Sequence, residues 1–176
     1  MILVKTSDIK FRFMFVVLLF ACLLEGCSRI PPEYRPFLVL SPDQRHAEMQ
    51  KLPIEKRIDY YLAGVRYLHP PQIGLADDMA KEGKQAIPVL LDRLKREKDE
   101  MTKFDIMYIF KVMHGSYYGL KDETEAIAQL KQTTNGMRDP SWKSRSEELL
   151  KFIVDNQSPD VEKVLDEMKQ SQERDN

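Results

Sequence analysis

The segment DEMTKFDIMYIFKVMH, residues Asp99–His114, has apolar side chains around most of a helical circumference. These are Phe104, Ile106, Met107, Tyr108, Ile109, Phe110, Val112 and Met113. A helix that is apolar on nearly all sides is normally buried among other elements. The segment therefore predicts a central helix, ended by the loop Gly115–Gly119, and an all-α fold packed around it.

Helical patterns also precede this segment. Ser41 followed by Pro42 and Gln44 has the composition of a helix N-terminus. The helix Ile54–Leu68 shows one apolar stripe and stops at His69-Pro70-Pro71, because a residue before proline avoids the α region. The remaining predicted helices on this side are Gly74–Glu82, capped by Gly83, and Gln85–Lys98.

Three more helices are predicted after the central segment. They are Asp122–Thr134, Ser141–Asp155 with Asp139 as N-cap and Pro140 at N1, and a last helix opened by Ser158-Pro159. In the last one Val161, Val164, Leu165 and Met168 share one face. No segment shows convincing strand alternation.

The N-terminus has the order of a secretory signal. Lys5, Lys10 and Arg12 precede an apolar run, Phe13–Leu24. The run is about a dozen residues, whereas a membrane-spanning helix needs roughly 20. A cleaved leader is therefore favoured over a permanent span.

The stretch Leu24-Glu25-Gly26-Cys27 resembles the bacterial lipobox, with Glu25 where a small or apolar residue is usual. The resemblance implies that residues 1–26 are removed and that Cys27 is acylated, which anchors the chain in the lipid bilayer. Ser28 follows where Asp tends to retain lipoproteins at the inner membrane, so the outer membrane is favoured, with the domain facing the periplasm. The alternatives are a plain secreted protein or an N-terminal helix anchor.

Composition limits the chemistry. Cys22 and Cys27 are the only cysteines, so the processed chain has no second thiol for a disulfide, a multi-cysteine metal site or a cysteine nucleophile. The net charge of −1 gives no reason to expect nucleic acid as a partner. We expect no cofactor and no metal.

Prolines define the organisation after Cys27. Pro31, Pro32, Pro36 and Pro42 predict a stiff, extended tether over residues 27–42. Within it, the apolar residues Phe37–Leu40 are expected to dock on the domain. The helical domain is then residues 43–170, followed by a polar tail, residues 171–176.

A weak internal repeat is also present. Ala86-Ile87 and Ala126-Ile127 are 40 residues apart, each early in a helix that precedes another helix. Asp139-Pro140 and Arg145 in the second unit resemble the HEAT pattern. This resemblance implies antiparallel helix pairs stacked as a short superhelix; the alternative is an irregular helical bundle. The whole chain also resembles bacterial lipoproteins.

No catalytic motif is evident. His46, His69 and His114 lie on different segments, and no phosphate-binding loop or nucleophile elbow is present. Asp77 and Asp78 are adjacent, so they point to different helix faces, and we expect both to be solvated.

Tyrosines mark the candidate partner-binding residues. Tyr60 and Tyr67 share a helix face just before His69, and Tyr117 and Tyr118 lie in a loop. Core or loop packing is the alternative reading of these side chains. We therefore expect a non-enzymatic interaction module that binds another envelope protein, in one version a pilotin-like or immunity-type helper. The rival hypothesis is an envelope hydrolase whose carboxylates converge in the fold.

Overall fold

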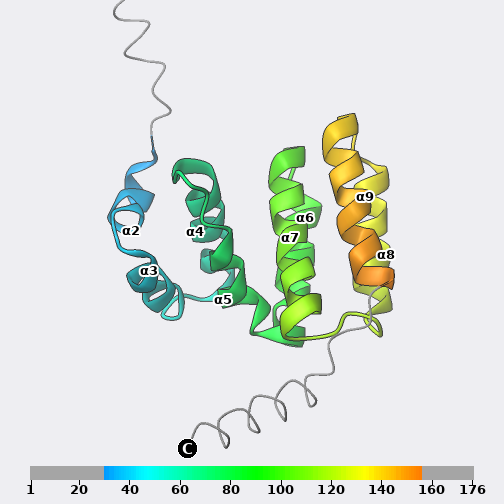
Figure 1. Cartoon of the computed structure of the whole chain (residues 1–176), viewed down its shortest axis with the longest axis horizontal. Helices are drawn as coiled ribbons and strands as arrows, with labels where there is room; N and C mark the ends of the chain where they lie inside the picture. The colour runs from blue at the N-terminus through cyan, green and yellow to red at the C-terminus, as the bar shows by residue number, and fades with distance from the viewer. Residues whose placement is uncertain (1–29, 156–176) are drawn as a thin grey trace, which may run out of the picture. The chain divides into compact units, whose positions relative to one another are not determined.

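The structure is a computed structural model that describes residues 30–155 (Figure 1). The chain divides into two compact units, Met1–Arg35 and Pro36–Asn176. In the described part of the first unit, Pro32–Tyr34 forms a 3-10 helix, η1, and Arg35 Nε donates to the carbonyl of Ile30 at 3.2 Å. The predicted signal peptide, Cys27, the last predicted helix and the polar tail lie outside the described residues.

The described residues are helical and contain no strand, which confirms the all-α prediction. The α-helices are α2 (Arg35–Leu38), α3 (Pro42–Met49), α4 (Ile54–Tyr67), α5 (Asp77–Ala80), α6 (Ile87–Arg96), α7 (Glu100–Ser116), α8 (Thr124–Asn135) and α9 (Pro140–Asp155). Two short 3-10 helices, η2 (Ile73–Ala76) and η3 (Gly83–Gln85), flank α5. The single helix predicted over residues 74–82 is therefore divided between η2 and α5.

The predicted helix starts form through side-chain caps. Ser41 and Gln44 make a reciprocal capping box at α3. The carboxylate of Asp99 accepts the backbone N–H of Thr102 at 2.9 Å, and that of Asp139 accepts the N–H of Ser141 at 2.8 Å. Each cap satisfies backbone donors that the first helical turn leaves unpaired, and the predicted caps at Ser41 and Asp139 are confirmed.

The predicted extended tether is wrong for residues 32–38, which form η1 and α2. Proline has a φ compatible with the first turn of a helix, so Pro32 and Pro36 do not prevent these short turns. Phe37 and Leu38 are buried, as the docking prediction requires, but Val39 is 81% exposed. The apolar run therefore docks through its first two residues only.

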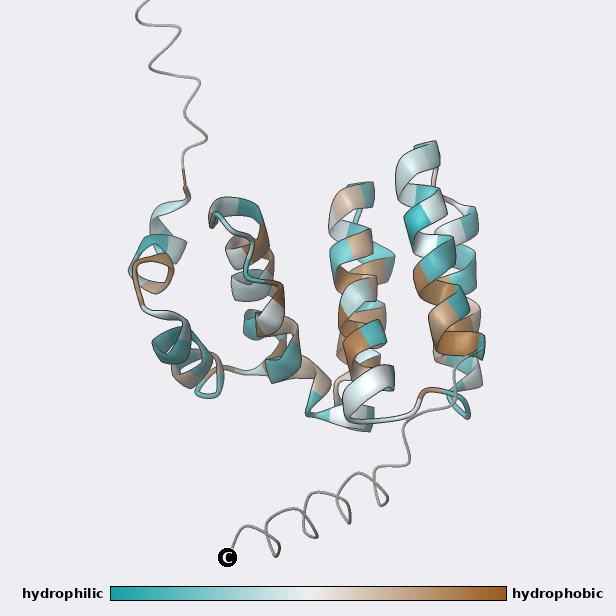
Figure 2. Cartoon of the chain, viewed as in Figure 1, coloured by the Kyte–Doolittle hydropathy of each residue, from teal (hydrophilic) through white to brown (hydrophobic). Residues whose placement is uncertain are grey.

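Helix α7 lies at the centre of the second unit and packs against α4, α5, α6 and α9. Ile106, Met107, Ile109, Phe110 and Met113 are fully buried. Figure 2 shows strongly hydrophobic residues on α7 and on the C-terminal half of α9. The prediction of a central helix is confirmed for this side of α7, whereas its remaining face is only half-buried.

The pairs α6–α7 and α8–α9 share a set of buried positions at an interval of 40 residues. Helix α7 packs beside α9, and α6 packs beside α8 (Figure 1). Buried positions of the first pair coincide with buried positions of the second: Ala86 with Ala126, Leu90 with Leu130, Leu94 with Thr134, Ile106 with Ser146, Ile109 with Leu149, and Met113 with Ile153. Both pairs thus use the same helical faces for their cores.

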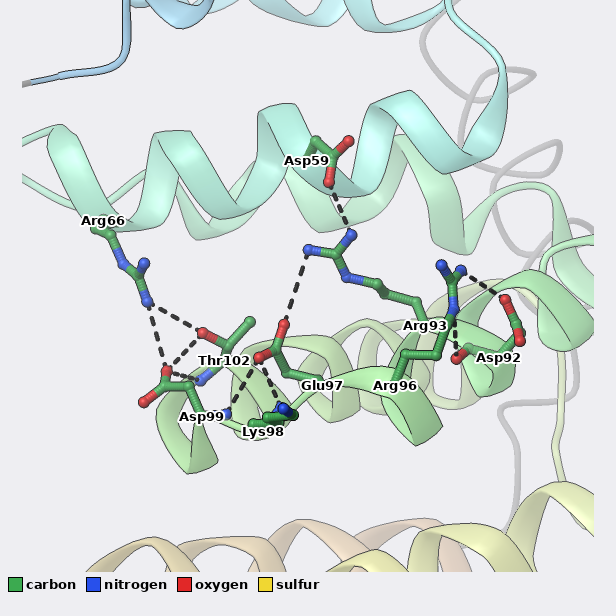
Figure 3. Close-up of polar contacts among 9 residues, drawn as sticks. All are labelled: Asp59, Arg66, Asp92, Arg93, Arg96, Glu97, Lys98, Asp99 and Thr102. Atoms are coloured by element: carbon green, nitrogen blue, oxygen red, sulfur yellow. Dashed lines mark hydrogen bonds and ion pairs between the residues drawn. The ribbon is translucent and has the colours of Figure 1, made fainter.

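Polar contacts join α4 to the α6–α7 pair (Figure 3). Arg93 on α6 forms an ion pair with Asp59 on α4 at 3.1 Å. Arg66, near the end of α4, donates to the hydroxyl of Thr102 at 3.1 Å in the first turn of α7. Since the end of α4 meets the start of α7, the two helices run antiparallel.

Glu100 joins the starts of α7 and α9. Its carboxylate accepts the backbone N–H of Arg138 at 2.7 Å and that of Asp139 at 2.9 Å. These hydrogen bonds lower the pKa of Glu100, because they favour its ionised form. The second pair is therefore oriented by a contact with the first turn of α7.

A core substitution tests the equivalence of the two pairs. We expect Leu90→Ala and Leu130→Ala each to lower the free energy of unfolding by about 2–5 kcal/mol, because both side chains are fully buried. Urea denaturation measures the change, and Gln132→Ala, at an exposed position of α8, is the control with an expected change below about 0.5 kcal/mol. A small effect at Leu130 alone would show that the second pair is not part of the core.

Candidate binding surface

Aromatic and cationic side chains gather where α7 lies beside α9. We name this set the α7–α9 aromatic face; it consists of Phe104, Tyr108, Lys111, Trp142, Arg145 and Phe152. Arg145 is exposed and the other five are half-buried. Aromatic residues with a partly accessible ring and a nearby cation are common anchors at protein interfaces.

Ring contacts order this face from one end to the other. The rings of Phe104 and Trp142 lie 5.5 Å apart, and the guanidinium of Arg145 lies 5.0 Å from the Trp142 ring. Further along, Lys111 Nζ lies 5.4 Å from the Phe152 ring and 5.6 Å from the Tyr108 ring. These distances fall within the range of cation–π attraction, so both cations are held over aromatic rings.

Sequence reasoning missed this face. The apolar pattern assigns Phe104 and Tyr108 to a buried central helix, whereas both side chains are half-buried. The spacing did contain a signal, since Phe104 and Tyr108 are four residues apart and Trp142 and Arg145 are three apart, so each pair shares a helix face. The helical spacing does not show that these faces of α7 and α9 meet, because that depends on how the two helices pack.

The predicted residues of α4 are only partly accessible. Tyr60 is half-buried and meets the ring of Phe37 edge-on, with 4.8 Å between ring centroids. Tyr67 is half-buried at the end of α4, and His69 is exposed in the following turn, where the His69–Pro70 peptide bond is cis. Tyr60 thus helps to dock the N-terminal part of the domain.

The two loop tyrosines make contacts within the protein. Tyr117 donates its hydroxyl hydrogen to Asp77 at 2.9 Å, and desolvation followed by this hydrogen bond raises the pKa of Tyr117 to about 12. Tyr118 donates to Glu123 at 2.6 Å, and its ring packs on Gly83, whose φ is +55°. Both rings therefore hold the loop between α7 and α8 in place.

The five predicted tyrosine and histidine positions do not form one surface. Tyr67 and His69 lie at the end of α4 that contacts the first turn of α7 through Arg66. Tyr117 and Tyr118 follow the last residue of α7, and a 17-residue helix is about 25 Å long. Their role in partner binding remains a prediction.

Asp78 corrects the expectation of two solvated acids. It is 2% exposed, and its carboxylate lies 2.7 Å from His46 Nδ1 and accepts a hydrogen bond from Gln50 at 2.9 Å. Arg57 donates to the backbone carbonyl of Asp78 at 3.0 Å. This network fastens α3 and α4 to α5. Asp77 points elsewhere, to Tyr117, as adjacent residues on a helix should.

A groove of about 530 Å³ lies between α6 and α8. Its floor includes Ile87, Leu91 and Ala126. Gln129 crosses it to donate to the carbonyl of Leu91 at 2.9 Å, and Lys84 forms an ion pair with Glu123 at 3.2 Å near one end. These internal contacts fasten the two helices together.

The carboxyl group of Asp105 has a strongly raised pKa. Burial raises its pKa from 3.8 to about 6, against the opposing effect of Arg66. Its neighbour Asp99 is different: hydrogen bonds from the Thr102 side chain and backbone lower the pKa of Asp99. The two carboxyl groups thus have distinct environments, and Asp99 is engaged as a helix cap.

Residues 30–155 contain no group of three potential ligands arranged for a metal ion. Within the same range, no helix combines the length and the hydrophobicity needed to cross a membrane. Comparisons with protein-family profiles, curated proteins and solved structures gave no match.

Asp105 predicts a pH dependence of stability. The pKa of Asp105 is higher in the folded state than in the unfolded state. Its contribution to the free energy of unfolding is therefore complete below about pH 3.8 and is lost as the pH rises through about 6. We therefore expect the free energy of unfolding of Asp105→Asn, relative to that of the wild type, to be higher at about pH 7.5 than at about pH 4. Urea denaturation at both pH values measures this, with Asp122→Asn, at an exposed position, as the control. The prediction would be contradicted if the free energies of unfolding of the wild type and Asp105→Asn differed by the same amount at both pH values.

Proposed function

We propose that this protein is a bacterial lipoprotein whose helical domain binds another protein of the cell envelope and is not an enzyme. The α7–α9 aromatic face is the observation that carries the proposal. It combines four half-buried aromatic rings with two cations, which is the composition of interface anchors rather than of an acid–base pair. The chemistry of the face suits a partner segment with apolar and acidic side chains.

HEAT-like stacking fits the repeat of the two helix pairs. The shared burial positions recur every 40 residues, and Asp99 and Asp139 cap the second helix of each pair. Stacked pairs place their second helices side by side, as α7 and α9 are, and such surfaces serve as extended binding sites. Pilotin-like or immunity-type helpers are narrower versions of this function.

Membrane attachment rests on the lipobox resemblance at Cys27. Two or three acyl chains at this residue would anchor the domain firmly, since one chain alone binds only marginally. The outer membrane is the proposed location, with the domain in the periplasm. Residues 28–35 would then connect the anchor to the unit that begins at Pro36.

The hydrolase alternative would use acids that converge with opposed pKa values. Asp105 has the raised pKa that a general acid needs. Its charged neighbour Asp99 already accepts hydrogen bonds from Thr102 at 2.9 and 2.6 Å and lies 3.4 Å from Arg66. Because Asp99 already caps α7, Asp105 and Asp99 are a poor acid–base pair, and the binding proposal is favoured over catalysis.

Mass spectrometry of the protein purified from bacterial membranes tests the anchor. We expect a processed chain that begins at Cys27, with a diacylglyceryl thioether on the sulfur and an acylated α-amine. Cys27→Ser should abolish both the processing and the lipid masses, whereas Cys22→Ser should leave them unchanged. An intact leader or an unmodified Cys27 sulfur in the wild-type protein would refute lipidation.

Quantitative capture from membranes tests the binding surface. We expect at least one partner to be recovered in stoichiometric amount with the wild type and about 30-fold less with Arg145→Glu, since loss of an interface anchor costs about 2 kcal/mol or more. Trp142→Ala should have a similar effect.

Arg138→Glu is the matched control. Arg138 is exposed, like Arg145, and its replacement by Glu reverses the same charge. Its side chain is outside the α7–α9 aromatic face. Recovery that falls equally with Arg145→Glu and Arg138→Glu would indicate a general charge effect. Absence of any stoichiometric partner would contradict the binding function.

A further inference from the structure

The α8–α9 pair exposes apolar positions that its neighbour buries. At the interval of 40 residues, Phe110 is fully buried but Leu150 is only half-buried. His114 is 1% exposed, whereas its counterpart Val154 is 43% exposed. Because equivalent positions of equivalent helices differ, the difference must come from what lies outside each pair.

The second pair covers these positions in the first. His114 meets the ring of Phe152 on α9, and Ile87 lines the groove opposite Ala126 on α8. The counterpart of Ile87 is Ile127, which is half-buried. We name Ile127, Leu150 and Val154 the end face. Helices α8 and α9 are antiparallel, so the N-terminal half of α8 and the C-terminal half of α9 contribute these residues at the same end of the pair.

The chain that follows α9 matches the end face. Helix α9 ends at Asp155, and the last predicted helix opens three residues later, at Ser158-Pro159, outside the described residues. The segment Ser158–Met168 is the 11-residue part of it that reaches the last apolar residue. Its apolar residues Val161, Val164, Leu165 and Met168 have the spacing of a single helical stripe. An 11-residue helix is about 16 Å long, close to the roughly 18 Å of the 12-residue α8.

We propose that Ser158–Met168 docks as a helix on the end face of its own chain, beside α8, in the way that α8 docks beside α6. A helix this short is unstable alone in water, so burial of its stripe against Ile127, Leu150 and Val154 supplies the stability that it needs. The docked helix also removes these apolar side chains from solvent. It requires neither the lipid anchor nor a partner protein.

Disulfide cross-linking tests the position of the segment. The full chain, with Cys22→Ser and Cys27→Ser and purified in detergent, receives Lys131→Cys on the exposed edge of the end face and Leu165→Cys on the apolar stripe. Mild oxidation should join the two cysteines within one molecule. The control pair, Lys131→Cys with Lys163→Cys, should give at least about 5-fold less product, because position 163 is on the opposite side of the helix.

Equal yields from the two cysteine pairs would overturn the proposal, as they indicate a segment without a preferred face. Disulfides between molecules would also overturn it, because a second copy would then occupy the end face. Hydrogen exchange of the full chain gives an independent measurement. Residues 158–168 should exchange at least about 10-fold more slowly in the wild type and Lys163→Asp than in Leu165→Asp or Val154→Asp, and equally fast exchange in all four would overturn the proposal.

Discussion

Burial of α7 is the constraint on which the rest of the domain depends. Ile106, Phe110 and Met113 are fully removed from solvent, and α7 contacts helices on both sides of it in the sequence. The region 30–155 contains no cysteine, so no disulfide limits the unfolded chain there. Cohesion must therefore come from apolar contact, with the Asp99 cap and the Arg66–Thr102 hydrogen bond fixing where α7 begins.

Local signals made most helices predictable. Ser41, Asp99 and Asp139 mark helix starts because each supplies a carboxylate or hydroxyl oxygen to backbone donors within three residues, which sequence alone can reveal. Four apolar residues of α6 that share one helical stripe, Ile87, Leu90, Leu91 and Leu94, are all buried. Periodicity succeeds here because one side of α6 faces solvent and the other does not.

Long-range contacts were not predictable in the same way. His46 and Asp78 are 32 residues apart, and nothing local distinguishes the buried Asp78 from the adjacent Asp77. The α7–α9 aromatic face was missed for the same reason: an amphipathic pattern identifies apolar residues but not which of them a neighbour covers. The tether prediction failed because prolines that block a helix interior are compatible with its first turn.

The Glu100 contact gives the helical array a direction. One carboxylate at the start of α7 accepts two backbone N–H groups from the start of α9, so this contact orients the helix pair that follows α7 in the sequence. The residue equivalent to Glu100 in α9 is Pro140, which has no side-chain acceptor. The start of α9 therefore cannot repeat the Glu100 contact, and an element placed after α9 would have to be oriented by other side chains.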